Sequence, residues 1–235
     1  VEVNTQTDFV ARGEAFKDFV TNVANAAMTA TPGSDLNQSK YPGTDKPIDQ
    51  VRQELVSKTG ENTVVRRWET VVAKEANGFV HAYVHMGGKL AVLVHAEAPN
   101  ADALKNPAFS AFIDNCAMQI AAMNPMVVAK DGVSHAHIAK QKEIFQAQLK
   151  EENKPEAAWA KIIEGKVNKW FTEVTLLGQD NVWDPGKGTI DALRGALGKE
   201  LGGEVKIHHF FRFGLGDGIE KKGDDLANEV AKLIQ

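Results

Sequence analysis

The chain of 235 residues contains an internal repeat, and this repeat limits its possible folds more than any other feature. One set recurs at an offset of 93: Phe16, Phe19, Asn22, Ala24 and Pro32 are matched by Phe109, Phe112, Asn115, Ala117 and Pro125. A later set recurs at an offset of 142: Ile48, Asp49, Leu55, Gly60 and Trp68 are matched by Ile190, Asp191, Leu197, Gly202 and Phe210. Such repeats indicate that one structural unit is built twice, so we predict two similar subdomains.

The first copy begins with an extended segment that leads into a helix. Val1 and Val3 alternate with polar residues, as in a strand, and Thr7 and Asp8 carry oxygens that can cap a helix. A helical apolar stripe follows, formed by Phe16, Phe19, Val20, Val23, Ala24 and Ala27. Residues 94–96 match the strand at 1–3, so the same pairing of strand and helix is expected twice. We therefore predict an α+β fold of antiparallel sheets packed with helices.

Phe9 has two possible positions in this scheme. It lies seven residues before Phe16, so it could belong to the same buried stripe. Gly13 weakens the helix between them, so Phe9 could instead point outward at the tip, beside Asp8. The pattern leaves both alternatives open.

The remaining elements follow from turn and helix signals. A helix is predicted at 48–59 and ends at Gly60. Two antiparallel strands are predicted at 63–74 and 79–86, joined by a turn at 75–78, because Asn77-Gly78 is a strong hairpin signal. The second copy is predicted to have a strand at 90–95, a long helix at 107–123 and a last strand at 205–213.

The difference between the two offsets indicates an insertion of about 49 residues between Pro125 and Ile190. Within it, residues 138–150 and 155–171 have helical character, and the short connection ends at Pro155, which suits the first position of a helix. Helices joined so tightly pack antiparallel. We predict an inserted helical hairpin at about 133–177, whose apolar side chains, Trp159 and Trp170 included, form either its seam or a contact surface.

These elements divide the chain into three predicted parts. Residues 1–88 form the first core subdomain, and residues 89–213 form the second, which carries the inserted hairpin. Residues 214–235 are predicted to form a C-terminal helical module. The chain starts without Met inside a predicted strand, so we expect further residues upstream.

Composition excludes several classes of function. A net charge of −4 provides no basic excess for direct binding of nucleic acid. No apolar run approaches the ~20 residues of a membrane span, and no signal peptide is visible. The single cysteine, Cys116, excludes an intrachain disulfide and lies in an apolar helical run, where a core position is expected.

Catalytic and cofactor motifs find little support in the sequence. The glycines at 214–218 lack the Lys-Ser/Thr of a phosphate-binding loop and are interpreted as turn residues. The histidines lie on or near predicted strands or in short pairs, without a zinc-binding spacing to cysteines: His81, His85, His95, His135, His137, His208 and His209. We predict no cofactor, no metal and no enzymatic chemistry.

Four short stretches, spread over nearly the whole chain, form a more specific pattern. They are EVNTQTDFVAR at 2–12, KTGEN at 58–62 with VRR at 65–67, IEGK at 163–166 with VTL at 174–176, and FRFG at 211–214 with GIEK at 218–221. This pattern resembles the family of bacterial and organellar elongation factor Ts, the guanine-nucleotide exchange factor of elongation factor Tu. The resemblance implies a role in translation elongation, in the bacterial cytoplasm or in an organelle matrix or stroma. It also implies that the inserted hairpin is a coiled coil.

The resemblance further implies which residues contact the GTPase. In the family, the turn that corresponds to Thr7, Asp8, Phe9 and Val10 is a wedge whose Phe enters the GTPase domain and disturbs the magnesium and phosphate sites. His85 belongs to the same contact surface, and Thr59 and Gly60 are secondary contacts. From the residues alone, Phe9 could equally be a core residue, Asp8 a helix cap, His85 a strand end and Gly60 a helix terminator.

The partner implied by the resemblance is elongation factor Tu, contacted through its GTPase domain and a second domain. The family's N-terminal helical domain, with its Thr-Gly-Ala-Gly motif, is not among these 235 residues, and Thr5 stands where a cysteine is common. The alternative hypothesis is an interaction or assembly module without exchange activity, which uses the same docking surface or forms a homodimer.

Overall fold

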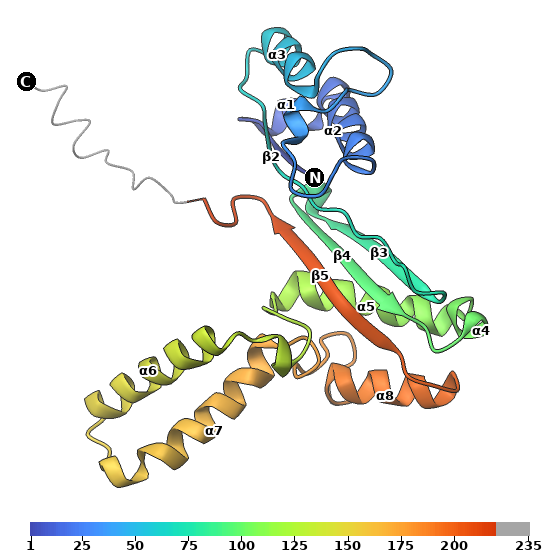
Figure 1. Cartoon of the computed structure of the whole chain (residues 1–235). Coiled ribbons are helices and arrows are strands. Elements are labelled where there is room, and N and C mark those ends of the chain that lie inside the picture. Colours follow the sequence, from blue (N-terminus) through green and yellow to red (C-terminus); the bar gives the residue numbers. More distant parts are fainter. Residues whose placement is uncertain (220–235) are drawn as a thin grey trace, which may run out of the picture.

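The computed structural model describes residues 1–219, which form two packed units of helices and strands (Figure 1). The first unit contains the strands β1 (Glu2–Asn4) and β2 (Val64–Arg67), the helices α1 (Asp8–Arg12), α2 (Glu14–Ala27) and α3 (Ile48–Thr59), and the 3-10 helix η1 (Leu36–Gln38). β1 pairs antiparallel with β2. The predicted stripe of α2 packs over this pair, and the buried cluster consists of Phe16, Phe19, Val23, Ala26, Ala27, Leu36, Ile48, Leu55 and Val65.

The second unit is built on a three-stranded antiparallel sheet in the order β3-β4-β5. Its elements are β3 (Gly78–His85), η2 (Met86–Gly88), β4 (Leu90–Glu97), α4 (Ala101–Leu104), α5 (Pro107–Met123), η3 (Lys130–Gly132), α6 (His135–Glu151), α7 (Glu156–Val174), α8 (Ile190–Glu200) and β5 (Lys206–Gly214). α5 crosses one face of the sheet (Figure 1). The structure is thus of the predicted α+β class.

The order of the elements agrees with the repeat in the sequence. Strand, long helix, shorter helix and strand occur first as β1, α2, α3 and β2 and again as β4, α5, α8 and β5. In each case the first and last strands of the set pair antiparallel. The insertion therefore separates α5 from α8 without changing the plan of the second unit.

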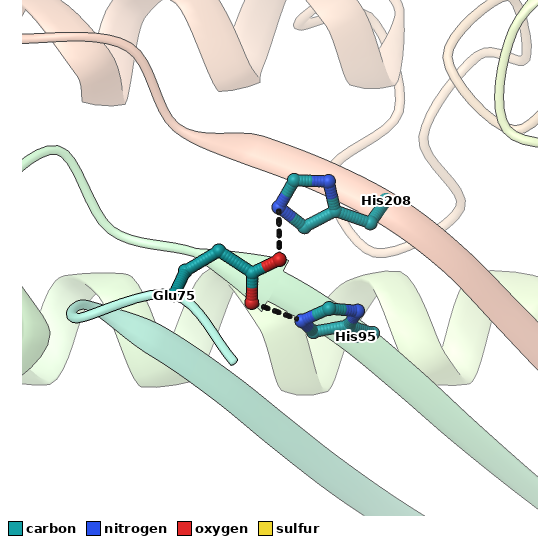
Figure 2. Close-up of side chains that lie close together, drawn as sticks. All are labelled: Glu75, His95 and His208. Carbon is teal, nitrogen blue, oxygen red and sulfur yellow. Dashed lines mark hydrogen bonds and ion pairs between the residues drawn. The ribbon is translucent and has the colours of Figure 1, made fainter. Parts of the chain in front are cut away.

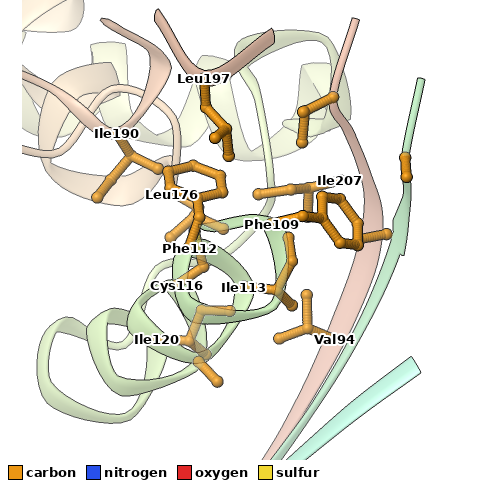
Figure 3. Packing of buried hydrophobic residues seen from close by; sticks show 14 of the residues in the cluster. Val94, Phe109, Phe112, Ile113, Cys116, Ile120, Leu176, Ile190, Leu197 and Ile207 are labelled. Carbon is orange, nitrogen blue, oxygen red and sulfur yellow. The ribbon is translucent and has the colours of Figure 1, made fainter. Parts of the chain in front are cut away.

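α5 supplies the centre of the larger core (Figure 3). Its first turn is capped by Asn106, whose side chain accepts a hydrogen bond from the backbone of Ala108, and Pro107 occupies the first turn. Phe109, Ile113 and Cys116 follow one another on the inner face, and each is fully buried. The prediction that Cys116 is a core residue is confirmed, and burial raises the pKa of its thiol.

One predicted hairpin is wrong in part. The turn at 75–78 is present, since the Gly78 amide donates to the Glu75 carbonyl over 3.0 Å. However, β2 ends at Arg67 and pairs with β1, and residues 68–77 contain no strand. The partner of β3 is β4, and the two strands pair antiparallel over eight residues without a register shift. A tight turn joins them at Gly87-Gly88, where both glycines have positive φ.

The predicted limits of the parts differ from the grouping of the buried residues. The boundary between residues 88 and 89 falls inside the turn that joins β3 to β4, and Phe79 and Tyr83 of β3 pack against the larger cluster. Of the predicted C-terminal module, residues 214–219 end β5 and form a turn, whereas residues 220–235 lie outside the described residues.

Among the described helices, none combines the length and apolar composition of a membrane span.

The inserted segment forms two long helices that lie side by side, α6 and α7 (Figure 1). Leu149 and Val167 are buried, whereas Ile144 is exposed, so only part of the apolar surface is used as a seam. Backbone hydrogen bonds between residues 126–128 and 174–177 attach the pair to the rest of the chain. The coiled-coil character of this pair stays a prediction.

The two units are joined by a cluster of charged side chains. Glu2, only 8% exposed, accepts hydrogen bonds from Arg66 and Arg67. Although burial raises the pKa of Glu2, the hydrogen bonds from the two arginines outweigh this effect and lower the pKa below its ordinary value. Both arginines also reach the end of the second unit: Arg66 donates to the Asp217 carbonyl and Arg67 to the Gly214 carbonyl.

The attachment of α6 and α7 predicts that they can be removed. We expect a variant in which a short Gly-Ser loop replaces residues 135–173 to unfold over the same temperatures as the parent, because the entropy cost of closing the connection varies slowly with its length. Circular dichroism during heating measures this. A deletion extended through Leu176 is the control, because that side chain is fully buried and its loss should cost about 2–5 kcal/mol of unfolding free energy. An unfolded shorter variant would contradict the prediction.

Candidate functional site

α1 presents Phe9 to solvent at one end of the first unit. The helix begins because the Thr7 side chain accepts a hydrogen bond from the Val10 amide, and it ends at Gly13, whose backbone is extended. Gly13 thereby separates α1 from α2, so Phe9 does not continue the buried stripe of α2. The Phe9 residue is 91% exposed, which resolves the two alternatives in favour of the outward position.

The turn before α1 is held by a single carboxylate, that of Glu61. It accepts hydrogen bonds from the Thr5 hydroxyl at 3.0 Å, the Gln6 amide at 3.2 Å, the Thr7 amide at 2.9 Å and the Thr7 hydroxyl at 2.5 Å. The Thr7 hydroxyl contributes most to lowering the pKa of Glu61, because its hydrogen bond favours the ionised carboxylate. Phe9 therefore stands on a turn that is tied to a second element of the chain.

Gly60 positions the Glu61 carboxylate. It ends α3 in the left-handed conformation, with φ of 73°, and the chain turns there so that Glu61 faces residues 5–7. Thr59 is half-buried, and its hydroxyl donates to the Leu55 carbonyl over 2.9 Å. Sequence reasoning did not identify Glu61 as a site residue, although Glu61 lies in the KTGEN stretch. The available signal in the sequence was an acidic residue directly after Gly60, a glycine predicted to end a helix.

Asp8 connects α1 to the turn between β3 and β4. Its carboxylate lies 3.2 Å from the Lys89 ammonium and 3.5 Å from the Arg12 guanidinium. Lys89 directly follows η2, and His85 directly precedes it. The structure therefore brings the predicted site residues Asp8 and Phe9 toward the segment that contains His85.

His85 stands at the end of β3, where its Nδ1 forms a hydrogen bond of 3.0 Å with the Tyr83 hydroxyl. Its neighbours Val84 and Met86 are 64% and 67% exposed. We define Asp8, Phe9, Val84, His85 and Met86 as the tip surface. Val10 is not part of it, because its side chain packs against the core of the first unit.

The tip surface is exposed and mixed in composition. It combines three exposed apolar side chains with an ion pair and an imidazole, and exposed apolar side chains that gather in one place are typical of interaction sites. Thr7, Thr59 and Gly60 lie behind it and support the backbone. Chemically, the arrangement offers an exposed aromatic ring beside an ion pair and an imidazole.

Comparisons with known proteins agree with the resemblance found in the sequence. The family model for elongation factor Ts matches residues 6–217. The elongation factor Ts of Syntrophotalea carbinolica is 40% identical over 238 residues, which cover 100% of this chain and 76% of that protein. That of Clostridium kluyveri is 40% identical over 239 residues, with the same coverage. That of Bdellovibrio bacteriovorus is 38% identical over 236 residues, again covering 100% and 76%.

The matched region includes the tip surface and extends from its supporting turn almost to the end of the described residues. The assignment to a family rests on the match of the family model and on the identity over the whole chain, because an exposed aromatic residue alone identifies no family. The chain therefore belongs to the elongation factor Ts family, a family of translation elongation factors.

Proposed function

We propose that this chain is a guanine-nucleotide exchange factor that binds elongation factor Tu in its GDP-bound form and promotes the release of GDP. The observation that carries the proposal is the position of Phe9, a large apolar side chain that is 91% exposed at the tip of α1. Membership of the family supports elongation factor Tu as the partner.

Exchange of this kind needs no covalent chemistry. The factor must bind the nucleotide-free GTPase more tightly than the GDP-bound GTPase, and by thermodynamic linkage it then weakens GDP binding by the same factor. A side chain that enters the GTPase only when the nucleotide site is distorted provides such a difference. Phe9 suits this role because its ring has apolar surface to bury, worth about 1.5–3 kcal/mol for a full side chain.

Rigidity makes the ring effective as a wedge. The turn before it is held by the four hydrogen bonds of Glu61, and α1 is held against the β3–β4 turn by the pair Asp8 and Lys89. Because these contacts order the tip before binding, less conformational entropy is lost in the complex. In this proposal His85, Val84 and Met86 contact the GTPase beside Phe9, whereas Thr7, Thr59 and Gly60 act by supporting the tip and Val10 anchors α1.

The first prediction concerns Phe9 itself. We expect Phe9→Ala to slow the release of fluorescent GDP from elongation factor Tu by about tenfold or more, as for a central contact residue. Its unfolding free energy should stay within about 0.5 kcal/mol of the parent, because the ring is exposed. Stopped-flow fluorescence and denaturant titration measure the two quantities.

Two control variants test whether Phe9 is a contact residue or a core residue. Met28→Ala truncates another exposed apolar residue, 72% exposed, and should leave release unchanged. Phe19→Ala removes a ring that is 2% exposed and should cost about 3–5 kcal/mol of stability. If Phe9→Ala behaves like Phe19→Ala, the residue is structural. If the parent binds elongation factor Tu but releases no GDP, the chain is an interaction module instead.

Asp8 provides a second prediction. We expect Asp8→Ala to reduce GDP release less than Phe9→Ala does, because it loosens α1 against Lys89 while the ring remains. Rates should be compared at equal folded fraction, since loss of first-turn charge can cost up to about 1 kcal/mol of stability. Lys89→Met should reproduce the effect if the ion pair positions α1. An unchanged rate in both variants would assign no role to the pair.

Glu61 provides a third prediction, tested by pH. Its pKa is below the ordinary 4.5 in the folded chain, so its stabilisation is fully present above that value and is lost as the pH falls through the lowered pKa. We expect Glu61→Gln to speed hydrogen exchange at the Gln6 and Thr7 amides near neutral pH and to slow GDP release. The difference in protection between the parent and the variant should shrink on acidification. Equal protection at neutral pH would show that Glu61 does not hold the turn.

A further inference from the structure

Three side chains from separate segments meet on the three-stranded sheet, far from α1 along β4. Glu75 comes from the turn before β3, His95 from β4 and His208 from β5 (Figure 2). His95 Nε2 forms a hydrogen bond of 2.9 Å with one Glu75 oxygen, and His208 Nε2 lies 4.0 Å from the other oxygen of that carboxylate and 3.1 Å from Glu97. One oxygen or nitrogen from each residue lies within 4.8 Å of the other two.

The cluster contains more than an ordinary carboxylate–imidazole pair. Such a pair exists elsewhere on the same sheet, where His81 Nε2 lies 2.8 Å from Asp114, and it includes no second imidazole among the described residues. At the cluster, a second imidazole approaches the carboxylate that His95 already binds. The His95 side chain is only 6% exposed, and its Nδ1 has no hydrogen-bond partner in residues 1–219. Nε2 is therefore the ring nitrogen that faces the carboxylate.

The donor atoms suit a transition-metal cation. Two imidazole nitrogens and one carboxylate oxygen are a common set for Zn²⁺, whereas Mg²⁺ and Ca²⁺ prefer oxygen ligands alone. In a tetrahedral zinc site with bonds of about 2.0–2.1 Å, the donors lie about 3.3 Å apart. The 2.9 Å separation ends on one oxygen of Glu75 and the 4.0 Å separation on the other, and one donor atom from each residue lies within 4.8 Å of the others. Side-chain movements of about 1.5 Å or less would therefore bring the three donors to the tetrahedral spacing.

Three residues among those described bring a donor atom into the group, and Glu97 lies next to it. Glu97 lies 3.1 Å from His208 Nε2, but its carboxylate is also engaged by the Lys206 ammonium at 3.4 Å. A carboxylate paired with an ammonium is a weaker ligand, so a water molecule is the expected fourth ligand. His209 stacks edge-on against His95 and presents no nitrogen to the group of donors.

We propose that Glu75, His95 and His208 form a binding site for Zn²⁺ or a similar divalent transition-metal cation. The ion would tie residues 68–77, which connect the two units and contain no strand, to β4 and β5. Binding only to the folded chain stabilises that chain in proportion to the logarithm of the ion concentration. The sequence pattern did not reveal the site, because its residues are far apart in the chain and include no cysteine.

The test uses the full chain without a histidine tag, after treatment with a chelator. Calorimetric titration with ZnCl₂ should show one ion per chain, and saturating Zn²⁺ should raise the thermal midpoint. Co²⁺ should give the intense visible absorption of a four-coordinate complex. A parent chain that binds no Zn²⁺ tighter than about 1 mM would overturn the proposal.

Ligand variants locate the ion. We expect His208→Gln and Glu75→Gln to weaken Zn²⁺ binding by at least about tenfold and to abolish the Co²⁺ band. Both residues are part-exposed, so these variants should stay folded, which circular dichroism checks. His81→Gln is the matched control, because it removes an imidazole from the ordinary pair on the same sheet. If His208→Gln and Glu75→Gln bind like the parent, or if His135→Gln abolishes binding instead, the site lies elsewhere and the assignment is wrong.

Discussion

The relative placement of the two units depends on the ion pairs of Glu2 with Arg66 and Arg67. Glu2 lies in β1 and the arginines in β2, so the pairs first hold the small sheet together. The same arginines donate to carbonyls at the end of β5 and just beyond it, and Arg67 lies over the Phe213 ring at 4.2 Å. A buried carboxylate that lost both arginines would be left with an uncompensated charge, which is strongly destabilising. The position of α1 above the β3–β4 turn follows from this junction.

The helix α1, which carries part of the tip surface, is ordered by contacts with residues that are distant in the sequence. A helix of five residues is too short to be stable by itself in water. α1 persists because its preceding turn is bonded to Glu61, its first residue to Lys89, and Val10 to the core. These contacts leave Phe9 free of any structural task, so its exposed ring is compatible with a role in binding.

Local periodicity predicted most helices well, since α3 and α5 begin and end at the expected residues. It also predicted the burial of Phe16, Phe19 and Cys116, because apolar residues at helical spacing have little alternative. Strand pairing was harder. Asn77-Gly78 does form a turn, yet residues 68–74 lack a partner ladder, and the glycines at 87 and 88 were the turn that joined two strands. Pairing depends on which neighbour is reached in three dimensions, and this information is not local.

The site was predictable only as far as the motifs reached. The resemblance pointed to Asp8, Phe9 and His85, and the structure brings their segments together through Lys89. No pattern in the sequence links Glu61 to residues 5–7, because that contact spans 54 positions or more. The convergence of Glu75, His95 and His208 likewise exists only once the sheet has formed. Long-range polar contacts are therefore the part of a site that sequence reasoning misses most readily.

The two hydrophobic clusters differ in size, and this difference affects how the chain comes apart. Among residues 1–219, the first cluster contains nine buried residues, whereas the second contains eighteen and includes nearly all the buried residues of α5. Cores that share few apolar contacts open as separate cooperative blocks, and the smaller block opens at the lower free-energy cost. The block that carries Phe9 is the smaller one. Heating or denaturant should thus unfold the first unit while the three-stranded sheet remains intact, so that a chain can keep most of its circular dichroism after the unit that carries Phe9 has melted.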